Sequence, residues 1–178
     1  MKLRIRKGLF SWQLIDESGT TVAKICMKKI LGASKIICDE KGNLIYTTDI
    51  VNLPAKTEVW NYADTKKYVI YKNKKPIAIA NLKFATNPER TKVQKFLLRP
   101  PQVDRMDVET LYGNWVIERQ KNNGVTISHN GILLGKVTPF FTLKPIYLEY
   151  KGQYEATFWA GIYMLIEYMM HEDDLIVV

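Results

Sequence analysis

The stretch EATFWAGIYMLIEYMM, residues 155–170, is the most apolar run in the chain and decides the fold. Crossing a bilayer takes about 20 apolar residues. Residues 156–170 supply only 15, with Glu167 among them, and rise about 22 Å as a helix. A helix that is apolar on every face and does not cross a membrane must be surrounded by protein, because a surface helix shows a polar stripe. We therefore predict a buried helix over about 155–171, with Glu155 and His171 at the ends that the helix dipole favours.

Hairpin signals fill the sequence before this helix. The segments LIDESGTTVAKI and IICDEKGNLIYTT both contain Asp-Glu-x-Gly, at residues 16–19 and 39–42, between apolar or β-branched runs. A polar pair followed by a glycine that can adopt positive φ is typical of a tight turn between antiparallel strands. Less regular copies turn at Asn123-Gly124 and Asn130-Gly131. Together these signals predict about a dozen short strands.

The strands and the helix fit one architecture. A barrel of about twelve strands has an interior too wide for its own side chains to fill, and the apolar helix can fill it. We predict a mainly β fold, a closed antiparallel barrel of about twelve strands around a central C-terminal helix, with LIVV (residues 175–178) as a final strand. A chain of 178 residues buries enough apolar surface without disulfides or metal ions, so one domain over residues 1–178 is expected.

Several segments resemble one protein family. They are the two Asp-Glu-x-Gly hairpins, YGNWVIER leading into GILLGKV, IYLEYKGQYEA before the helix, and FWAGIYMLIEYMM. The chain resembles the group that comprises tubby C-terminal domains, LURP-one-related proteins and phospholipid scramblases. The resemblance covers nearly the whole chain and implies a twelve-stranded barrel around a hydrophobic helix. It also implies an anionic-lipid or phosphate surface, since tubby proteins recognise phosphoinositide head groups with basic residues on the barrel.

The N-terminal segment and the cysteines indicate the compartment. The apolar run LFSWQLI that follows residues 2–7 is broken by Ser11 and Gln13 and is too short for a signal-peptide core. Cys26 and Cys38 lie in β-branched runs and form no C-x-x-C pair, which predicts buried free thiols. We expect a cytoplasmic protein without a transmembrane segment, with any peripheral association with a membrane removable by salt.

Signatures of catalysis and of metal binding are weak. His129 in TISHNG is expected to be a solvated imidazole at a turn, because no nearby motif supplies the partner that a general base needs. The run HEDD, residues 171–174, is read as the solvated exit of the helix, not as a metal site. No nucleotide-binding or hydrolase motif occurs. We therefore predict a protein that is not an enzyme, with no catalytic residue, metal or cofactor.

Charge asymmetry is the best functional clue in the sequence. The chain has a formal net charge of +8, and residues 66–99 hold ten of the basic residues against Glu89 alone. Lysines on hairpin tips also serve solubility, which is the simplest explanation of the segment. The alternative is a surface for an anion.

Strand alternation divides this basic segment into two groups. In PIAIANLKFA the residues Ala78, Ala80, Leu82 and Phe84 suit an inward face, which turns Lys83 outward. If residues 92–99 form the strand that pairs with it, the cations near the loop TNPERTK converge. The predicted anion-binding residues are Lys83, Arg90, Lys92, Lys95 and Arg99. A second group, Lys72, Lys74 and Lys75, is expected at the opposite end of the strand.

Three functions follow from these features. The first is a cytosolic binding module that docks on anionic phospholipid head groups or phosphate through the basic surface. The second is a scaffold that binds another protein and has no small ligand. The third is nucleic-acid binding, suggested by Trp60, Tyr62, Tyr68 and Tyr71 near Lys66 and Lys67, although aromatic residues are also ordinary in β-barrels.

Overall fold

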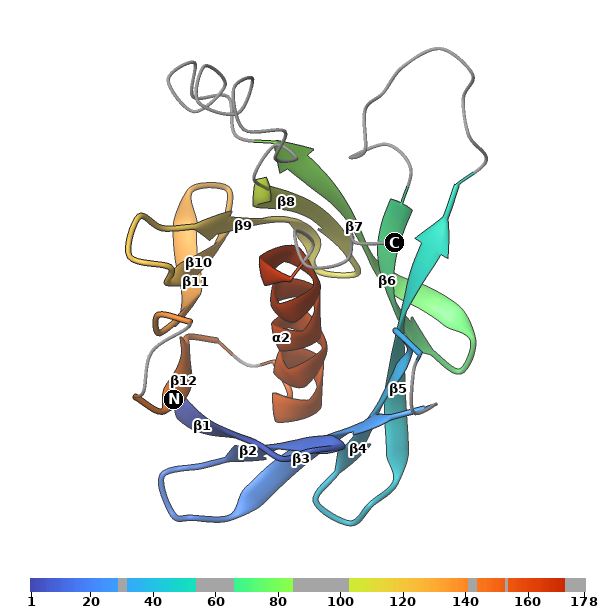
Figure 1. Cartoon of the computed structure of the whole chain (residues 1–178), viewed down its shortest axis with the longest axis vertical. Helices are drawn as coiled ribbons and strands as arrows, with labels where there is room; N and C mark the ends of the chain where they lie inside the picture. The colour runs from blue at the N-terminus through green and yellow to red at the C-terminus, as the bar shows by residue number, and fades with distance from the viewer. Residues whose placement is uncertain (29–31, 54–65, 85–102, 141–143, 153, 172–178) are drawn as a thin grey trace.

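In the part of the chain that the structure describes, twelve antiparallel strands form one closed barrel with a helix, α2, inside it (Figure 1). The structure is a computed structural model and describes residues 1–28, 32–53, 66–84, 103–140, 144–152 and 154–171. Each strand pairs with the next one along the chain, and β1 pairs with β12. The predicted fold, a closed antiparallel barrel of about twelve strands around a C-terminal helix, is confirmed.

Short strands and tight turns make up the wall. The strands are β1 (Lys2–Lys7), β2 (Ser11–Ile15), β3 (Thr21–Met27), β4 (Lys35–Asp39), β5 (Leu44–Asn52), β6 (Lys66–Lys72), β7 (Lys75–Phe84), β8 (Val103–Thr110), β9 (Gly113–Arg119), β10 (Val125–His129), β11 (Ile132–Val137) and β12 (Ile146–Tyr150), and α2 is Ala156–Met170. Because neighbouring strands are antiparallel, successive turns lie at opposite ends of the barrel. We call the end with the β1–β2 turn the helix-exit end, since α2 finishes there, and the other the helix-start end.

Both Asp-Glu-x-Gly segments form the predicted hairpin turns at the helix-start end. In each, the aspartate side chain accepts hydrogen bonds from two backbone N–H groups of its own turn, at 2.8–2.9 Å. Gly19 and Gly42 adopt φ values of +87° and +84°, which favour glycine. Side-chain hydrogen bonds from Ser18 and Asn43, together with these backbone bonds, lower the pKa of Asp16 and of Asp39 respectively. The turn residues identified in the sequence therefore set the boundaries of β2–β5.

Side-chain alternation separates the core from the surface. Ala23 and Ile25 of β3 are buried, whereas Lys24 between them is exposed. In β7, Ala78 and Ala80 face inward as predicted, and so does Leu82. The same period on the other strands lines the barrel with apolar side chains.

α2 fills the space that the strands enclose. Of its fifteen residues, fourteen are buried, and the helix differs from the predicted 155–171 by one residue at each end. It approaches the wall closely at Gly161, where a Cβ atom would meet Ile70 Cδ1 of β6 at 2.9 Å. At the helix-start end Trp159 packs against Trp115 and Tyr150, with ring centroids 5.5 and 4.8 Å apart. The helix is the core of the barrel, as the sequence predicted.

Buried polar groups connect the helix to the wall at the helix-exit end. Glu167 accepts a hydrogen bond from the Tyr163 hydroxyl and lies 2.7 Å from the ammonium of Lys7 on β1. His171 Nε2 lies 3.4 Å from the other carboxylate oxygen. The Tyr168 hydroxyl meets Thr48 of β5 at 2.8 Å. The carboxylate within the apolar run is therefore satisfied by partners from two elements.

Three further expectations have different outcomes. Cys26 and Cys38 are free, as predicted, but they are half-buried and lie on the outward-facing positions of β3 and β4, so the prediction of buried thiols was wrong. They face outward because the inward positions of these strands are taken by Ala23, Ile25 and Ile37. Among the described residues, no helix is long and apolar enough to cross a membrane. The strand predicted at residues 175–178 lies outside the described ranges.

Candidate anion-binding surface

Lys83 is the member of the predicted anion site that the structure describes. It is exposed on the outer face of β7, near the helix-exit end, and within the described chain it has no ion-pair partner. The other four predicted members, Arg90, Lys92, Lys95 and Arg99, lie outside the described residues. The structure therefore neither brings the five cations together nor separates them.

The strand beside Lys83 differs from the one that the sequence predicted. β7 pairs with β8 along seven residues, and Lys83 lies opposite Arg105, not opposite a residue of 92–99. The register shifts between Lys83 and Phe84, which interrupts the alternation at the start of β8. A bulge of this kind hides a strand from a period-two pattern. The predicted pairing across TNPERTK was wrong for this reason.

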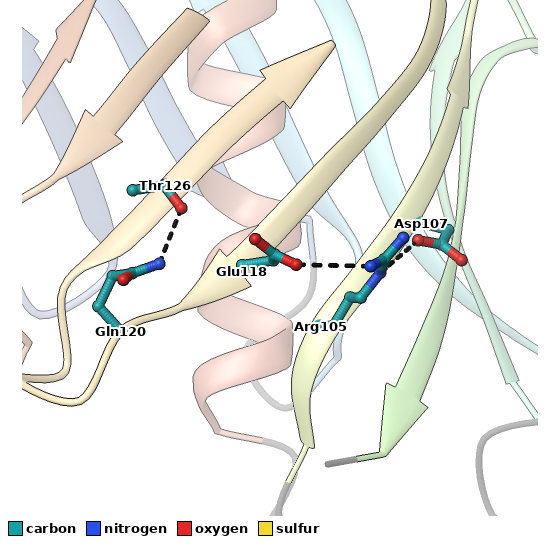
Figure 2. Close-up of polar contacts among 5 residues, drawn as sticks. All are labelled: Arg105, Asp107, Glu118, Gln120 and Thr126. Carbon is teal, nitrogen blue, oxygen red and sulfur yellow. Dashed lines mark hydrogen bonds and ion pairs between the residues drawn. The ribbon is translucent and has the colours of Figure 1, made fainter. Parts of the chain in front are cut away.

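Arg105 is held by two carboxylates on the outside of the barrel (Figure 2). Its Nε lies 2.9 Å from Asp107 Oδ1 on the same strand, and its Nη1 lies 3.5 Å from Glu118 Oε1 on β9. The hydrogen bond to Asp107 raises the pKa of Arg105. Gln120, just after β9, donates a hydrogen bond to Thr126 of β10, at 2.9 Å. The two carboxylates offset the positive charge with which Arg105 would attract another anion.

A shallow depression of about 490 Å³ surrounds this ion pair. Its lining residues are Lys83, Asp104, Arg105, Asp107, Glu118, Arg119 and Gln120. Three cations therefore face three carboxylates, so the described part of this surface has no net charge to attract a phosphate. The sequence analysis missed the carboxylates because they belong to β8 and β9, which strand pairing brings beside β7.

The outer face formed by β11, β12 and β1 also carries a ladder of ion pairs. Glu149 of β12 lies between two lysines, 2.9 Å from Lys136 Nζ on β11 and 3.3 Å from Lys2 Nζ on β1. The hydrogen bond from Lys136 lowers the pKa of Glu149. Strand register aligns these groups, since Glu149 pairs with Lys2 on one side and with Lys136 on the other. Both lysines are therefore paired with the same carboxylate, which leaves the ladder a net charge of +1.

Another outer face carries cations that no carboxylate balances. The strands β1, β2 and β3 contain no aspartate or glutamate. Arg4 and Arg6 of β1 and Lys24 of β3 are exposed, and register places Arg6 opposite Gln13, which lies opposite Lys24. Within the described chain none of the three makes an ion pair. We call Arg4, Arg6 and Lys24 the β1–β3 basic face.

Sequence reasoning missed the β1–β3 basic face because its residues are spread over 21 positions and no dense charge run marks them. A signal existed in strand alternation, since KLRIRK places Arg4 and Arg6 on one side and leucine and isoleucine on the other. The second predicted group, Lys72, Lys74 and Lys75, lies around the β6–β7 turn at the helix-start end, as predicted. Lys72 Nζ there lies 5.6 Å from the ring of Tyr46.

The histidine and acidic side chains of the described residues form no group that could hold a metal ion. His129 Nδ1 lies 2.8 Å from the backbone oxygen of Asn114, and its Nε2 lies 3.3 Å from the Asn130 amide. These contacts fix the ring at a turn. Within the residues that the structure covers, no three His, Cys, Asp or Glu side chains are grouped so as to hold a metal ion. Residues 172–174 of the HEDD run lie outside the described residues.

Comparison with protein-family models, with curated proteins and with solved structures finds no match for this chain. The resemblance to the tubby, LURP-one-related and scramblase group remains a prediction.

Proposed function

We propose that the protein is a non-enzymatic binding module that docks on anionic phospholipid head groups through cations on the outside of the barrel. The β1–β3 basic face carries this proposal, because its exposed arginines and lysine have no carboxylate in their strands, whereas Arg105, Lys136 and Lys2 are paired. Arginine and lysine donate charge-assisted hydrogen bonds to phosphate oxygens. Since α2 fills the interior, the outer surface is what remains for a ligand.

Lys83 and the neighbouring segment extend the proposal. Lys83 lies near the helix-exit end and has no ion-pair partner within the described chain, so it is available to an anion. Arg90, Lys92, Lys95 and Arg99 follow it in the sequence and add positive charge. In this proposal the protein is cytoplasmic and associates peripherally with an acidic membrane surface, in line with the resemblance to tubby-like proteins.

Charge reversal tests the proposal. We expect Arg6→Glu with Lys24→Glu to weaken binding to phosphatidylserine vesicles at least about thirtyfold, since each basic residue near an anionic leaflet contributes about 1 kcal/mol. Lys92→Glu with Lys95→Glu tests the predicted segment in the same way. The matched control, Lys74→Glu with Lys75→Glu, makes the same charge change at the helix-start end. Binding is measured by co-sedimentation, and thermal melting checks that each variant folds.

The outcomes separate the alternative functions. Equal losses from all three double variants would indicate diffuse attraction to the net charge and would contradict a localised surface. RNA that competes with the vesicles for the wild-type protein would favour nucleic-acid binding, because both ligands present phosphates. Failure of the wild-type protein to bind either vesicles or RNA would favour the protein-interaction scaffold.

A further inference from the structure

The β1–β2 turn exposes two large apolar side chains at the helix-exit end. Leu9 is 82% exposed and Phe10 is 57% exposed. Apolar side chains that stay exposed add nothing to the stability of the fold, so two adjacent ones at a hairpin tip are available to an apolar partner. Their position matters because the same strands carry the β1–β3 basic face.

The backbone of this tip is firmly held, so the exposure does not result from a loose loop. The turn closes with a hydrogen bond from Gly8 N–H to the Ser11 carbonyl, at 2.7 Å. Met27 N–H of β3 donates to the carbonyl of Phe10, at 3.3 Å. On the other side of the turn, Lys7 reaches into the barrel and lies 2.7 Å from the buried carboxylate of Glu167. The tip is thus anchored to itself, to β3 and to α2.

Exposed cations lie beside this apolar tip, on the outer face of the same strands. Arg6 directly precedes Lys7, and Lys24 lies two strands away in the same row. Lys28, just beyond β3, is exposed and within the described chain makes no ion pair. Apolar side chains with cations beside them complement the boundary of a bilayer, where acyl chains lie below anionic head groups.

Other occupants fit this tip less well. A stable protein partner needs about 1,000 Å² or more of complementary surface, whereas two projecting side chains offer a small convex contact that a fluid bilayer can surround. A soluble phosphate would gain nothing from leucine and phenylalanine, and of the two only Phe10 offers a ring on which a nucleic-acid base could stack. The apolar tip of Ile132 and Leu133 at the helix-start end has a different setting. Leu133 borders a groove lined by Glu17 and Lys151 and by Glu149, which pairs with Lys2 and Lys136, so carboxylates lie among its cations.

We propose that the barrel docks end-on, with Leu9 and Phe10 inserted into the outer part of an acidic bilayer and with Arg6, Lys24 and Lys28 on the head groups. This inference rests on the proposed function and deepens it, because it names a lipid bilayer, not free phosphate, as the source of the anions. Two apolar side chains are too few for stable anchoring without the cations, so salt still releases the protein.

Serine substitutions test the insertion. Leu9→Ser with Phe10→Ser is expected to weaken partitioning onto mixed phosphatidylcholine and phosphatidylserine vesicles about tenfold or more. Ile132→Ser with Leu133→Ser, which makes a similar change at a helix-start hairpin, is expected to leave partitioning within about twofold of wild type. All four side chains are at least 44% exposed, so both variants should melt like the wild type.

A fluorescent label reports insertion directly. In a chain with Cys26→Ser and Cys38→Ser, an environment-sensitive dye is attached at Leu9→Cys or, as a control, at Ile132→Cys. The dye at position 9 should shift to the blue with acidic vesicles, whereas inorganic phosphate should cause no shift at either position. No shift at position 9, or undiminished binding of the Leu9/Phe10 variant, would overturn this inference while leaving head-group binding intact. No binding of wild type to acidic vesicles would overturn both proposals.

Discussion

Glu167 shows at the scale of one residue how a carboxylate is kept inside an apolar barrel. Burial raises the pKa of Glu167. Hydrogen bonds from His171, Lys7 and Tyr163 and the charge of Lys7 together lower the pKa by more than burial raises it, so the net shift is downward. The side chain is 7% exposed and therefore depends on these partners. Tyr163, its neighbour on α2, has a pKa raised by burial and stays protonated as a donor.

Removing Lys7 should reveal this dependence. Lys7→Ala leaves Glu167 buried without an ammonium partner, and we expect a loss of about 1–3 kcal/mol in the free energy of unfolding. The value is below the about 3–5 kcal/mol typical of a fully buried pair. The Lys7 side chain is 37% exposed, and water replaces part of its contribution. Urea denaturation measures the change.

Lys2→Ala is the matched control, because Lys2 lies on the same strand and pairs with the more exposed Glu149. A loss below about 1 kcal/mol is expected there. The double variant Lys7→Ala with Glu167→Gln should recover part of the stability, since it no longer buries an unpaired charge. Equal losses from the two lysine variants would contradict the role of Glu167.

At the scale of the element, α2 contributes most to the core through side chains that touch the wall on all sides. Leu165→Ala or Ile166→Ala should each lower the free energy of unfolding by about 2–5 kcal/mol, because both side chains are fully buried. Leu111→Ala, at an exposed hairpin tip, is the control and should change it by less than about 0.5 kcal/mol. Chemical denaturation with unchanged midpoints for both helix variants would contradict the central position of α2.

The elements that could be predicted from the sequence are those with local signals. The Asp-Glu-x-Gly turns and the apolar run at residues 156–170 need no distant partner to be recognised, because turn chemistry and period are local. β8 begins with a bulge, so its alternation is broken and the segment 92–99 was chosen in its place. A register shift is a property of two strands together, and one segment alone does not reveal it.

The candidate site was predicted less well, since it depends on strand register. Lys83 was correctly turned outward, but the acidic neighbours of this surface come from strands 20 or more positions away. Charge counted along the sequence therefore overstated the free positive charge beside β7. The same count understated the free positive charge of the β1–β3 basic face, where strand pairing brings Arg6 and Lys24 into one row.

The whole molecule depends on one closing pair, β1 with β12, which joins residues 2–5 to residues 146–149. The N-terminal ammonium adds a hydrogen bond to the carbonyl of Tyr150, at 3.0 Å. Removing residues 1–7 would open two strand edges and leave Glu167 without Lys7. Exposed edges and an uncovered core favour a loosely packed state.

We expect the chain without residues 1–7 to bind the dye ANS and to lose hydrogen-exchange protection first in β2 and β12, the two strands that flank the gap. A peptide of residues 1–10 added in excess should restore protection by supplying the missing strand. A scrambled peptide of the same composition is the control. Unchanged protection of β12 in the truncated chain would contradict the closing role of β1.

The pairing of the first strand with the last also constrains how the chain can fold as it leaves the ribosome. β1 to β11 emerge first, with their apolar inward faces uncovered, and β12 and then α2 are synthesised after them. At about 5–20 residues per second, the early strands wait several seconds or more for the helix that covers them. Hairpins can form during that time, but the barrel cannot close. We therefore expect the nascent chain to be a client for chaperones that shield apolar surface, and a chain terminated before residue 156 would be a wall without its core.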